Sequence, residues 1–392
     1  MIVIVTKVLC YHQVYIADDL YRIYKDSFKF VQMREPLDWR IKNKQEGFER
    51  PYLVSYQKNP KIVLDLIKNA DVIIFGEAPL KLIRHKNKKC LLFKMSENIY
   101  KDTFSKISLF GRIKRRLSYS YLRLLTNNNH SYLLSCGAFA YRDYFKLNIF
   151  KNRCLKWGYF PYVPNVNENI IKNKFNDFDK IELIWVSRLI EWKKPFYLIY
   201  LTEKLIKRGI TNFHLTIVGN SDESAVDYYS MMKDTISKKG LSSFITMVGK
   251  VNADKVFEYY SKAHIALFTS DKSEGWSVGI GEAMSCGCAV VSSNTVGAAP
   301  FLIGNNNGAI FEYSSVEDFS EKVIGLLENR SMIKTLSFNG FEKIQKIWNH
   351  ENAAVRLSKI IDEYLANKTI TCCDDGPCSK ARVLNYDWYL EK

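Results

Sequence analysis

Two acidic residues bracket the stretch of this chain whose chemistry is most distinctive. Glu274 and Glu282 lie between two apolar runs, residues 265–268 and 289–291. The pattern predicts a strand, a loop, a short helix that begins near residue 277 and ends at Gly287, and a second strand. Unpaired amide N–H groups at the start of such a helix can bind an anion. One turn of chain could therefore hold a phosphate on amides while two carboxylates accept hydrogen bonds from hydroxyl groups, a combination that a sugar nucleotide offers.

Two successive series of strands and helices must position these residues. The expected strands are short, continuous apolar runs, the pattern of strands that are covered on both faces. They are residues 2–5, 72–75, 91–95, 132–135 and 155–160 in the first series, and 182–187, 214–218, 245–248, 265–268, 289–292 and 309–311 in the second. Segments with helical spacing, such as 61–69 and 197–208, lie between them. This alternation predicts an α/β protein with a parallel, doubly wound sheet in each half.

The spacing Glu-x7-Glu, followed by Ala-Met-Ser-Cys-Gly at residues 283–287 and a buried strand, resembles the donor-site signature of the family 4 (group 1) glycosyltransferases of the GT-B fold. The resemblance implies two Rossmann-like domains facing a cleft and a C-terminal helix that crosses back to the first domain. A polar, proline-punctuated linker around residues 161–180 separates residues 1–168 (acceptor side) from 169–345 (nucleotide-sugar-binding). Residues 346–366 resemble the family's closing helix, and we expect 367–392 to be a loosely ordered tail.

The resemblance also implies roles for individual residues. Glu274 would contact the transferring sugar and Glu282 the ribose, while Arg188 and Lys193, five residues apart after a strand, would hold the diphosphate. Fixed cations there would stabilise the charge that develops on a departing nucleoside diphosphate; neighbouring Lys194 could replace Lys193. Solvated charges and a structural loop are the alternative interpretation of these residues. The remaining expected donor contacts are Gly275, Trp276, Ser277 and Val278 at the phosphate, and Gly249 and Lys250 at the base.

In the first half of the chain the resemblance rests mainly on architecture. The family usually has a glycine-rich loop after the first strand, whereas residues 6–12 here contain no glycine. Glu97 and His12 follow strand ends and are candidates for contacting the acceptor or the donor sugar. The sequence contains no Asp-x-Asp pair at a strand end and no metal-ligand pattern, so we expect neither a metal nor another cofactor.

The net charge of +16 resides entirely in residues 1–168, which contain 30 Lys and Arg against 14 Asp and Glu. Within this half, residues 101–125 combine basic side chains with large apolar ones at helical spacing, a pattern typical of helices on an anionic membrane and also of ordinary surface helices. The candidate membrane contacts are Arg112, Lys114, Arg115 and Arg116, with Phe104, Leu109 and Phe110 at the interface.

With the resemblance, the sequence predicts an enzyme, a glycosyltransferase that transfers a hexose from a nucleotide sugar to a glycan or lipid-linked acceptor in cell-surface polysaccharide synthesis. The resemblance further implies that this hexosyltransferase acts with retention and is metal-independent. No apolar run approaches the length of a membrane span, and nine scattered cysteines fit reduced thiols, so we expect a cytoplasmic protein, peripheral at the inner face of the membrane. A GT-B-fold sugar-nucleotide epimerase or hydrolase remains an alternative. So does a non-catalytic nucleic-acid binder, although the aromatic–basic interleaving of such modules is missing.

Overall fold

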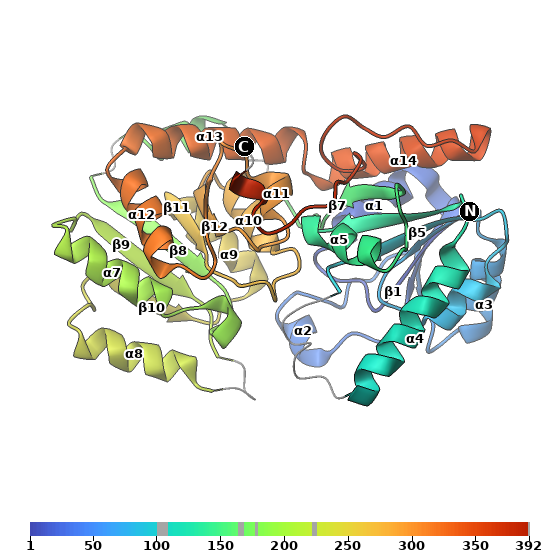
Figure 1. The fold of residues 1–392 in the computed structure, drawn as a ribbon, viewed down its shortest axis with the longest axis horizontal. Helices are drawn as coiled ribbons and strands as arrows, with labels where there is room; N and C mark the ends of the chain where they lie inside the picture. Colours follow the sequence, from blue (N-terminus) through green and yellow to red (C-terminus); the bar gives the residue numbers. More distant parts are fainter. Residues whose placement is uncertain (100–108, 164–167, 177–178, 222–225, 391–392) are drawn as a thin grey trace. The chain divides into compact units, whose positions relative to one another are not determined.

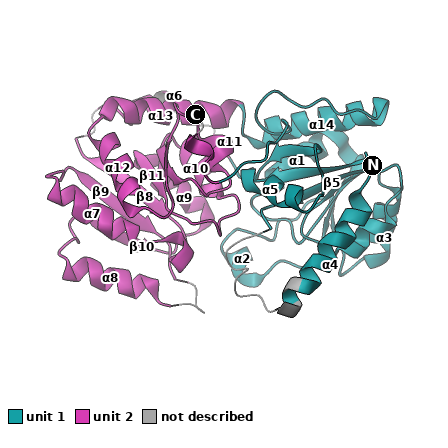
Figure 2. Cartoon of the chain, viewed as in Figure 1, with its two compact units in different colours: residues 1–162, 347–385 teal, residues 163–346, 386–392 magenta. Residues whose placement is uncertain are grey.

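The computed structural model describes residues 1–99, 109–163, 168–176, 179–221 and 226–390, and the chain forms two compact units (Figures 1 and 2). Unit 1 comprises Met1–Tyr162 and Ile347–Asn385, and unit 2 comprises Val163–Lys346 and Tyr386–Lys392. The first change of unit falls a few residues before the expected boundary at residue 168. The chain passes between the units after Tyr162, after Lys346 and again after Asn385.

Unit 1 is built on a seven-stranded sheet whose neighbouring strands all pair in parallel, in the order β3-β2-β1-β4-β5-β6-β7. The strands are β1 (Ile2–Thr6), β2 (Phe28–Gln32), β3 (Leu53–Ser55), β4 (Val72–Phe75), β5 (Leu91–Ser96), β6 (Ser131–Cys136) and β7 (Cys154–Trp157). β2 and β3 were not predicted. The strand expected over 155–160 ends at Trp157, because the chain leaves the sheet and the amide of Phe160 bonds instead to the carbonyl of His12, at 3.1 Å.

Helices cover both faces of this sheet. They are α1 (Val14–Tyr24), α2 (Asp38–Lys42), α3 (Pro60–Asn69), α4 (Leu109–Thr126), α5 (Ala138–Lys146) and α14 (His350–Asn367), with 3-10 turns at Lys25–Ser27 and Leu80–His85. Val3, Val5 and Ile73 pack in one apolar cluster with residues of α3, α4 and α5. α14 packs against α1, where Tyr24 donates to Asp362 at 3.0 Å and His350 lies 2.6 Å from Asp19.

The expectation of a loosely ordered tail is wrong. Beyond α14 the chain runs antiparallel beside β7, with bonds from the amide of Cys378 to the carbonyl of Lys156 (2.9 Å) and from the amide of Ala381 to the carbonyl of Cys154 (3.0 Å). Cys378 and Ala381 are buried. β7 is the last strand of the sheet, and its outer N–H and C=O groups would otherwise lack partners. These groups explain why a polar, cysteine-containing segment is ordered there.

Unit 2 contains a six-stranded parallel sheet in the order β10-β9-β8-β11-β12-β13. Each expected second-half strand is present: β8 (Ile181–Val186), β9 (Phe213–Val218), β10 (Ile245–Gly249), β11 (Ile265–Phe268), β12 (Ala289–Ser293) and β13 (Ala309–Phe311). The helices are α6 (Glu168–Asn173), α7 (Tyr197–Lys207), α8 (Tyr228–Lys238), α9 (Val256–Lys262), α10 (Val278–Ser285), α11 (Ala299–Leu302), α12 (Val316–Leu327) and α13 (Arg330–Lys346), with 3-10 turns at Glu191–Lys193, Ala253–Lys255 and Trp388–Leu390.

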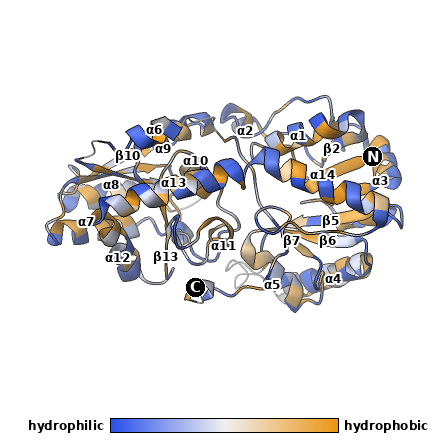
Figure 3. Ribbon diagram, turned by 90° about the horizontal axis from the view of Figure 1, so that it is seen from above, coloured by the Kyte–Doolittle hydropathy of each residue, from blue (hydrophilic) through white to orange (hydrophobic). Residues whose placement is uncertain are grey.

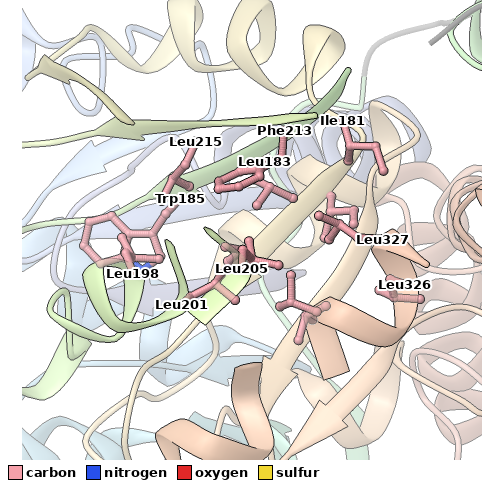
Figure 4. Close-up of a cluster of buried hydrophobic side chains, with 14 of the residues drawn as sticks. Ile181, Leu183, Trp185, Leu198, Leu201, Leu205, Phe213, Leu215, Leu326 and Leu327 are labelled. Carbon is pink, nitrogen blue, oxygen red and sulfur yellow. The ribbon is translucent and has the colours of Figure 1, made fainter. Parts of the chain in front are cut away.

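The core of unit 2 explains why these segments fold as they do. Leu183 and Trp185 of β8 pack with Leu198, Leu201 and Leu205 of α7 in one buried cluster (Figure 4). The spacing of the three leucines places them on one helix face. In Figure 3, hydrophilic and hydrophobic residues also alternate along α13 and α14, as in helices that cover a core on one side. Burial of each such side chain contributes roughly 1.5–3 kcal/mol. The ends of β8 and its neighbours are therefore fixed by a core that lies within unit 2.

In the part of the chain that the structure describes, no helix combines the length and the apolar character needed to cross a bilayer.

Candidate active site

The strand order of unit 2 creates one place where neighbouring strands lead to diverging loops. β8 lies beside β11, while the chain after β8 continues toward β9 and the chain after β11 toward β12. In open parallel sheets, ligands bind outside the carboxyl ends of the strands at this switch point. Here the two loops are residues 187–194 and 269–277. They contain the two cations predicted to hold a diphosphate and the acid predicted to contact a sugar.

Lys193 and Glu274 form a direct ion pair between the two loops. Each side chain is only 12% exposed, so the pair is largely removed from water. Ser270 donates a hydrogen bond to the same Glu274 carboxylate oxygen, at 3.0 Å. Backbone bonds also join the loops, since the amide of Asp271 donates to the carbonyl of Trp192 at 2.9 Å. A carboxylate and an ammonium group are thereby held together at the switch point.

The other two cations of the first loop have different positions. The guanidinium carbon of Arg188 lies 5.9 Å from the centre of the Trp192 ring, and the ammonium nitrogen of Lys193 lies 4.4 Å from it. Arg188 is exposed and shares this ring with Lys193. Lys194 instead donates to the carbonyl of Tyr313, at 2.8 Å. The structure therefore places Lys193 beside Glu274 and directs the alternative cation, Lys194, to a backbone carbonyl.

Helix α10 begins immediately after this loop, as the sequence predicts. Its N-cap residue, Ser277, has φ of 70° and makes no side-chain capping bond, so the first amides of the helix are not capped by that hydroxyl. At Gly279 an added Cβ would lie 3.0 Å from the Phe268 ring and from the Tyr260 hydroxyl, so a larger residue there would have to displace these side chains by a few tenths of an ångström. Trp276 is buried beside Phe301, so its side chain belongs to the core.

Glu282 lies in the second turn of α10 and is 9% exposed. It lies near the buried hydroxyl of Tyr260, whose pKa is raised well above its ordinary value, first by burial and then by the charge of Glu282. At the other end of the helix, the ammonium group of Lys174 donates to the carbonyls of Cys286 (3.1 Å) and Gly287 (3.2 Å). A cation at the C-terminus and anion-binding amides at the N-terminus both suit the helix dipole.

The residues expected at the base lie at the end of β10. Gly249 has φ of 83°, and its carbonyl accepts the amide of Gly219 at 2.8 Å; Lys250 is exposed. Gly219 was missed by the sequence analysis. A Cβ at this position would lie 1.8 Å from the carbonyl oxygen of Ser187, so only glycine lets the loop after β9 pass beside the Arg188 loop. A glycine directly after a buried strand was the available signal.

In unit 1, Tyr159 contacts both predicted acceptor-side residues, His12 and Glu97. The His12 ring lies 5.8 Å from the Tyr159 ring, and the Tyr159 phenol has a hydrogen bond to Glu97. Burial, and secondarily the charge of Arg40, lowers the pKa of His12 to about 4, so the ring is neutral at ordinary pH. Glu97 follows β5, and His12 lies in the loop after β1. The structure thus joins two residues that are 85 positions apart in the sequence.

Three charged residues in or just after neighbouring strands of the first sheet were missed. Lys7 and Glu77 follow β1 and β4, the switch point of the first sheet, and form an exposed ion pair of 3.0 Å. Lys94 of β5 is buried and donates to the carbonyl of Gly76 at 2.6 Å; burial lowers its pKa to about 8. A charged residue at the end of an apolar run was the signal for Lys7 and Glu77. Lys94, inside a predicted strand, gave none.

The expected membrane segment is described only in part. Phe104 lies outside the described residues, as do the side chains of Leu109, Phe110 and Arg112. Further along α4, three apolar side chains are exposed: Ile113 at 50%, Leu117 at 66% and Leu124 at 79%. Among the residues that the structure describes, no group of three or more His, Cys, Asp or Glu side chains is arranged to hold a metal ion.

Comparison with known proteins agrees with this architecture. Residues 166–343 match the family model described as Glycosyl transferases group 1. An uncharacterized glycosyltransferase of Methanocaldococcus jannaschii is 29% identical over 192 residues, which cover 49% of this chain and 47% of that protein. The capsular polysaccharide biosynthesis glycosyltransferase CapH of Staphylococcus aureus is 32% identical over 132 residues, which cover 34% of each chain. The matched region thus spans about half or less of the length of these relatives.

Among solved structures, Anabaena HepE in complex with UDP is similar over 93% of this chain and 99% of its own, with a TM-score of 0.67 and 13% sequence identity. At this identity the likeness concerns the fold, and it extends over both units. The expected GT-B architecture is confirmed. Residues 166–343 therefore form a domain of the group 1 glycosyl transferases, within a chain that has the GT-B fold.

Proposed function

We propose that this protein is a retaining, metal-independent hexosyltransferase that uses a nucleoside diphosphate sugar. The observation that carries the proposal is the arrangement of Lys193, Glu274 and Arg188 at the switch point of the second sheet. Two cations beside the start of a helix can bind the diphosphate, and the largely buried carboxylate can accept a hydrogen bond from a sugar hydroxyl. The UDP complex of HepE supports a nucleotide ligand for this fold.

In the proposed reaction, the diphosphate takes the place of Glu274 as the partner of Lys193. Arg188, whose guanidinium group also lies near the Trp192 ring, contacts the same diphosphate, and the amides of residues 275–278 contribute N–H donors. Negative charge grows on the diphosphate as the bond to the sugar breaks, and fixed cations stabilise that charge without reorganising. Glu274, released from Lys193, accepts a hydrogen bond from a sugar hydroxyl, and Glu282 accepts one from the ribose.

The acceptor would bind to unit 1 near His12, Glu97 and Tyr159. Neutral His12 can accept a hydrogen bond from a hydroxyl group, and the Glu97 carboxylate can do so as well. We propose a glycan or lipid-linked glycan as the acceptor, with a role in cell-surface polysaccharide synthesis; the likeness to CapH supports this class. All nine cysteines are free thiols, which supports a reducing, cytoplasmic location.

For a lipid-linked acceptor, we further propose that α4 contacts an anionic membrane surface. Ile113, Leu117 and Leu124 follow one another at intervals that place them on one helix stripe, while Leu122 faces the core. The helix also carries exposed Lys114, Arg116 and Arg123, and partly exposed Arg115. Exposed apolar side chains beside basic ones are the pattern of interfacial helices, in which each cation contributes about 1 kcal/mol.

Two experiments test these proposals. Thermal unfolding and calorimetry against a panel of nucleoside diphosphates and their sugars should identify a ligand, since binding raises stability by RT ln(1 + [L]/Kd). Lys193→Met and Arg188→Gln should lose most of that stabilisation while folding normally. Absence of binding across the panel would contradict the function. If the protein released the sugar to water and transferred none to any acceptor tested, it would instead be a hydrolase.

For the membrane contact, sedimentation with anionic vesicles should retain the wild type at low salt and release it as salt rises. Replacing Leu117 and Leu124 with Ser should reduce retention. Val355→Ser is the matched control, because Val355 is also an exposed apolar residue of unit 1, at 58%, but lies on α14; this variant should sediment as the wild type does. Equal retention on neutral and anionic vesicles would mean that the basic charge is only a solvated surface.

A further inference from the structure

The segment Tyr386–Leu390 packs on unit 2, whereas the residues that precede it, 369–385, belong to unit 1. Trp388 is 5% exposed, and its indole N–H donates to the carbonyl of Asn294 at 2.9 Å. The side-chain amide of Asn294 in turn donates to the carbonyl of Tyr386, at 2.9 Å. Tyr389 adds a bond of 3.2 Å to Glu312, which also accepts from Asn294 at 2.6 Å. A buried aromatic side chain and reciprocal hydrogen bonds make this a specific docking contact.

Asn294 connects the docked segment to the loop of Lys194. Its side-chain carbonyl accepts the amide of Tyr313 at 2.9 Å, and the carbonyl of Tyr313 accepts the ammonium group of Lys194 at 2.8 Å. Asn294 itself is 1% exposed, and its amide donates to the carbonyl of Phe311. A change in the position of Asn294 would therefore shift the carbonyl that holds Lys194.

The neighbours of Asn294 connect the same segment to the loop of Glu274. The hydroxyls of Ser293 and Thr295 both bond to the carbonyl of Ser270, at 2.5 and 3.3 Å. Ser270 donates through its own hydroxyl to Glu274. Two hydrogen bonds thus connect the Lys194 loop to Asn294, and two connect Glu274 to the residues on either side of Asn294 in the chain.

We infer that the C-terminal segment Tyr386–Leu390 is a supporting part of the donor site, with Trp388 and Asn294 as positioning residues. The inference rests on the proposed function for the identity of the ligand. Trp388 does not touch the donor; it fixes Asn294, which fixes the loops of Lys194 and Glu274. Loss of the segment should loosen both loops and weaken nucleotide binding while the sheet of unit 2 remains folded.

The test compares the wild type, Trp388→Phe and a variant that ends at Asn385. Trp39→Phe, at a half-exposed tryptophan of α2 in unit 1, is the matched control. Hydrogen–deuterium exchange of the ligand-free proteins measures the loops at residues 192–197 and 269–277. Calorimetry measures UDP affinity, and steady-state kinetics separates donor KM from kcat.

We expect the shortened variant to exchange faster in both loops and Trp388→Phe to do so less. We expect Trp388→Phe to bind UDP about three- to tenfold more weakly, the effect of one lost hydrogen bond, with donor KM rising by more than kcat falls. The control should match the wild type. Unchanged exchange and unchanged affinity in the shortened variant would overturn the inference. Failure of the wild type to bind any nucleoside diphosphate would overturn the proposed function instead.

Discussion

Replacing Glu274 with Gln should strengthen the binding of UDP while it weakens catalysis. In the structure Lys193 is paired with Glu274, and both side chains are 12% exposed. A diphosphate that binds Lys193 must displace this carboxylate and is also repelled by it. A hydrogen bond to a charged group contributes about 1.5–3 kcal/mol, and each 1.4 kcal/mol corresponds to a tenfold change in affinity. We therefore expect Glu274→Gln to bind UDP about tenfold more tightly and to transfer sugar at least about tenfold more slowly.

Calorimetry of UDP against the wild type and Glu274→Gln provides the measurement, followed by initial rates with the donor sugar. Glu317→Gln is a suitable control, because Glu317 also pairs with a lysine of unit 2, Lys204, but is 57% exposed and lies on α12. That variant should bind UDP as the wild type does. If Glu274→Gln bound UDP equally well or more weakly, the carboxylate would not compete with the diphosphate, and the assignment of Lys193 would be refuted.

Glu282→Ala should weaken UDP binding by about 1.5–3 kcal/mol in calorimetry, since the ribose loses a charged acceptor, and equal affinity would contradict that role. Dialysis against EDTA should leave the transfer rate unchanged, whereas an absolute requirement for magnesium or manganese would contradict the proposed leaving-group stabilisation. Burial lowers the pKa of Lys94 from 10.5 to about 8. Between pH 8 and pH 10.5 the Lys94 amine is therefore protonated in the unfolded chain but largely neutral in the folded protein. Wild-type stability should therefore rise from pH 8 to 10.5 relative to Lys94→Met, by about 3 kcal/mol in urea unfolding, and parallel profiles would exclude the shift.

The sequence predicted those strands that are continuous apolar runs. Ile265–Phe268 and Val72–Phe75 agree with the structure to the residue. β2 includes Lys29 and ends in Gln32, and β3 has only three residues, so neither stands out from its surroundings as a buried run. β2 pairs in register with β1, and β3 pairs in register with β2, so each strand depends on the edge that the preceding one provides.

The candidate site could be predicted residue by residue, but its contacts could not. Lys193 and Glu274 were both identified, yet their pairing depends on β8 and β11 being neighbours, although two other strands separate them in the sequence. The choice between Lys193 and Lys194 depended on where Tyr313 presents its carbonyl. The docking of Trp388 required the position of Asn294. Strand order and backbone position are properties of the whole fold, and short stretches of sequence do not encode them.

Unit 1 consists of two stretches of the chain that are separated by unit 2, and this affects the order in which the protein folds during synthesis. Unit 2 is almost contiguous in sequence, whereas α14, which packs on α1, is made only after residues 163–349. At typical synthesis rates this delay lasts about 10 to 40 s. Throughout that time all strands of the first sheet have been synthesised, but α14, which covers α1, and the segment that pairs with β7 have not. We expect the nascent chain to depend on chaperones at that stage, and we expect a fragment ending at Tyr162 to aggregate.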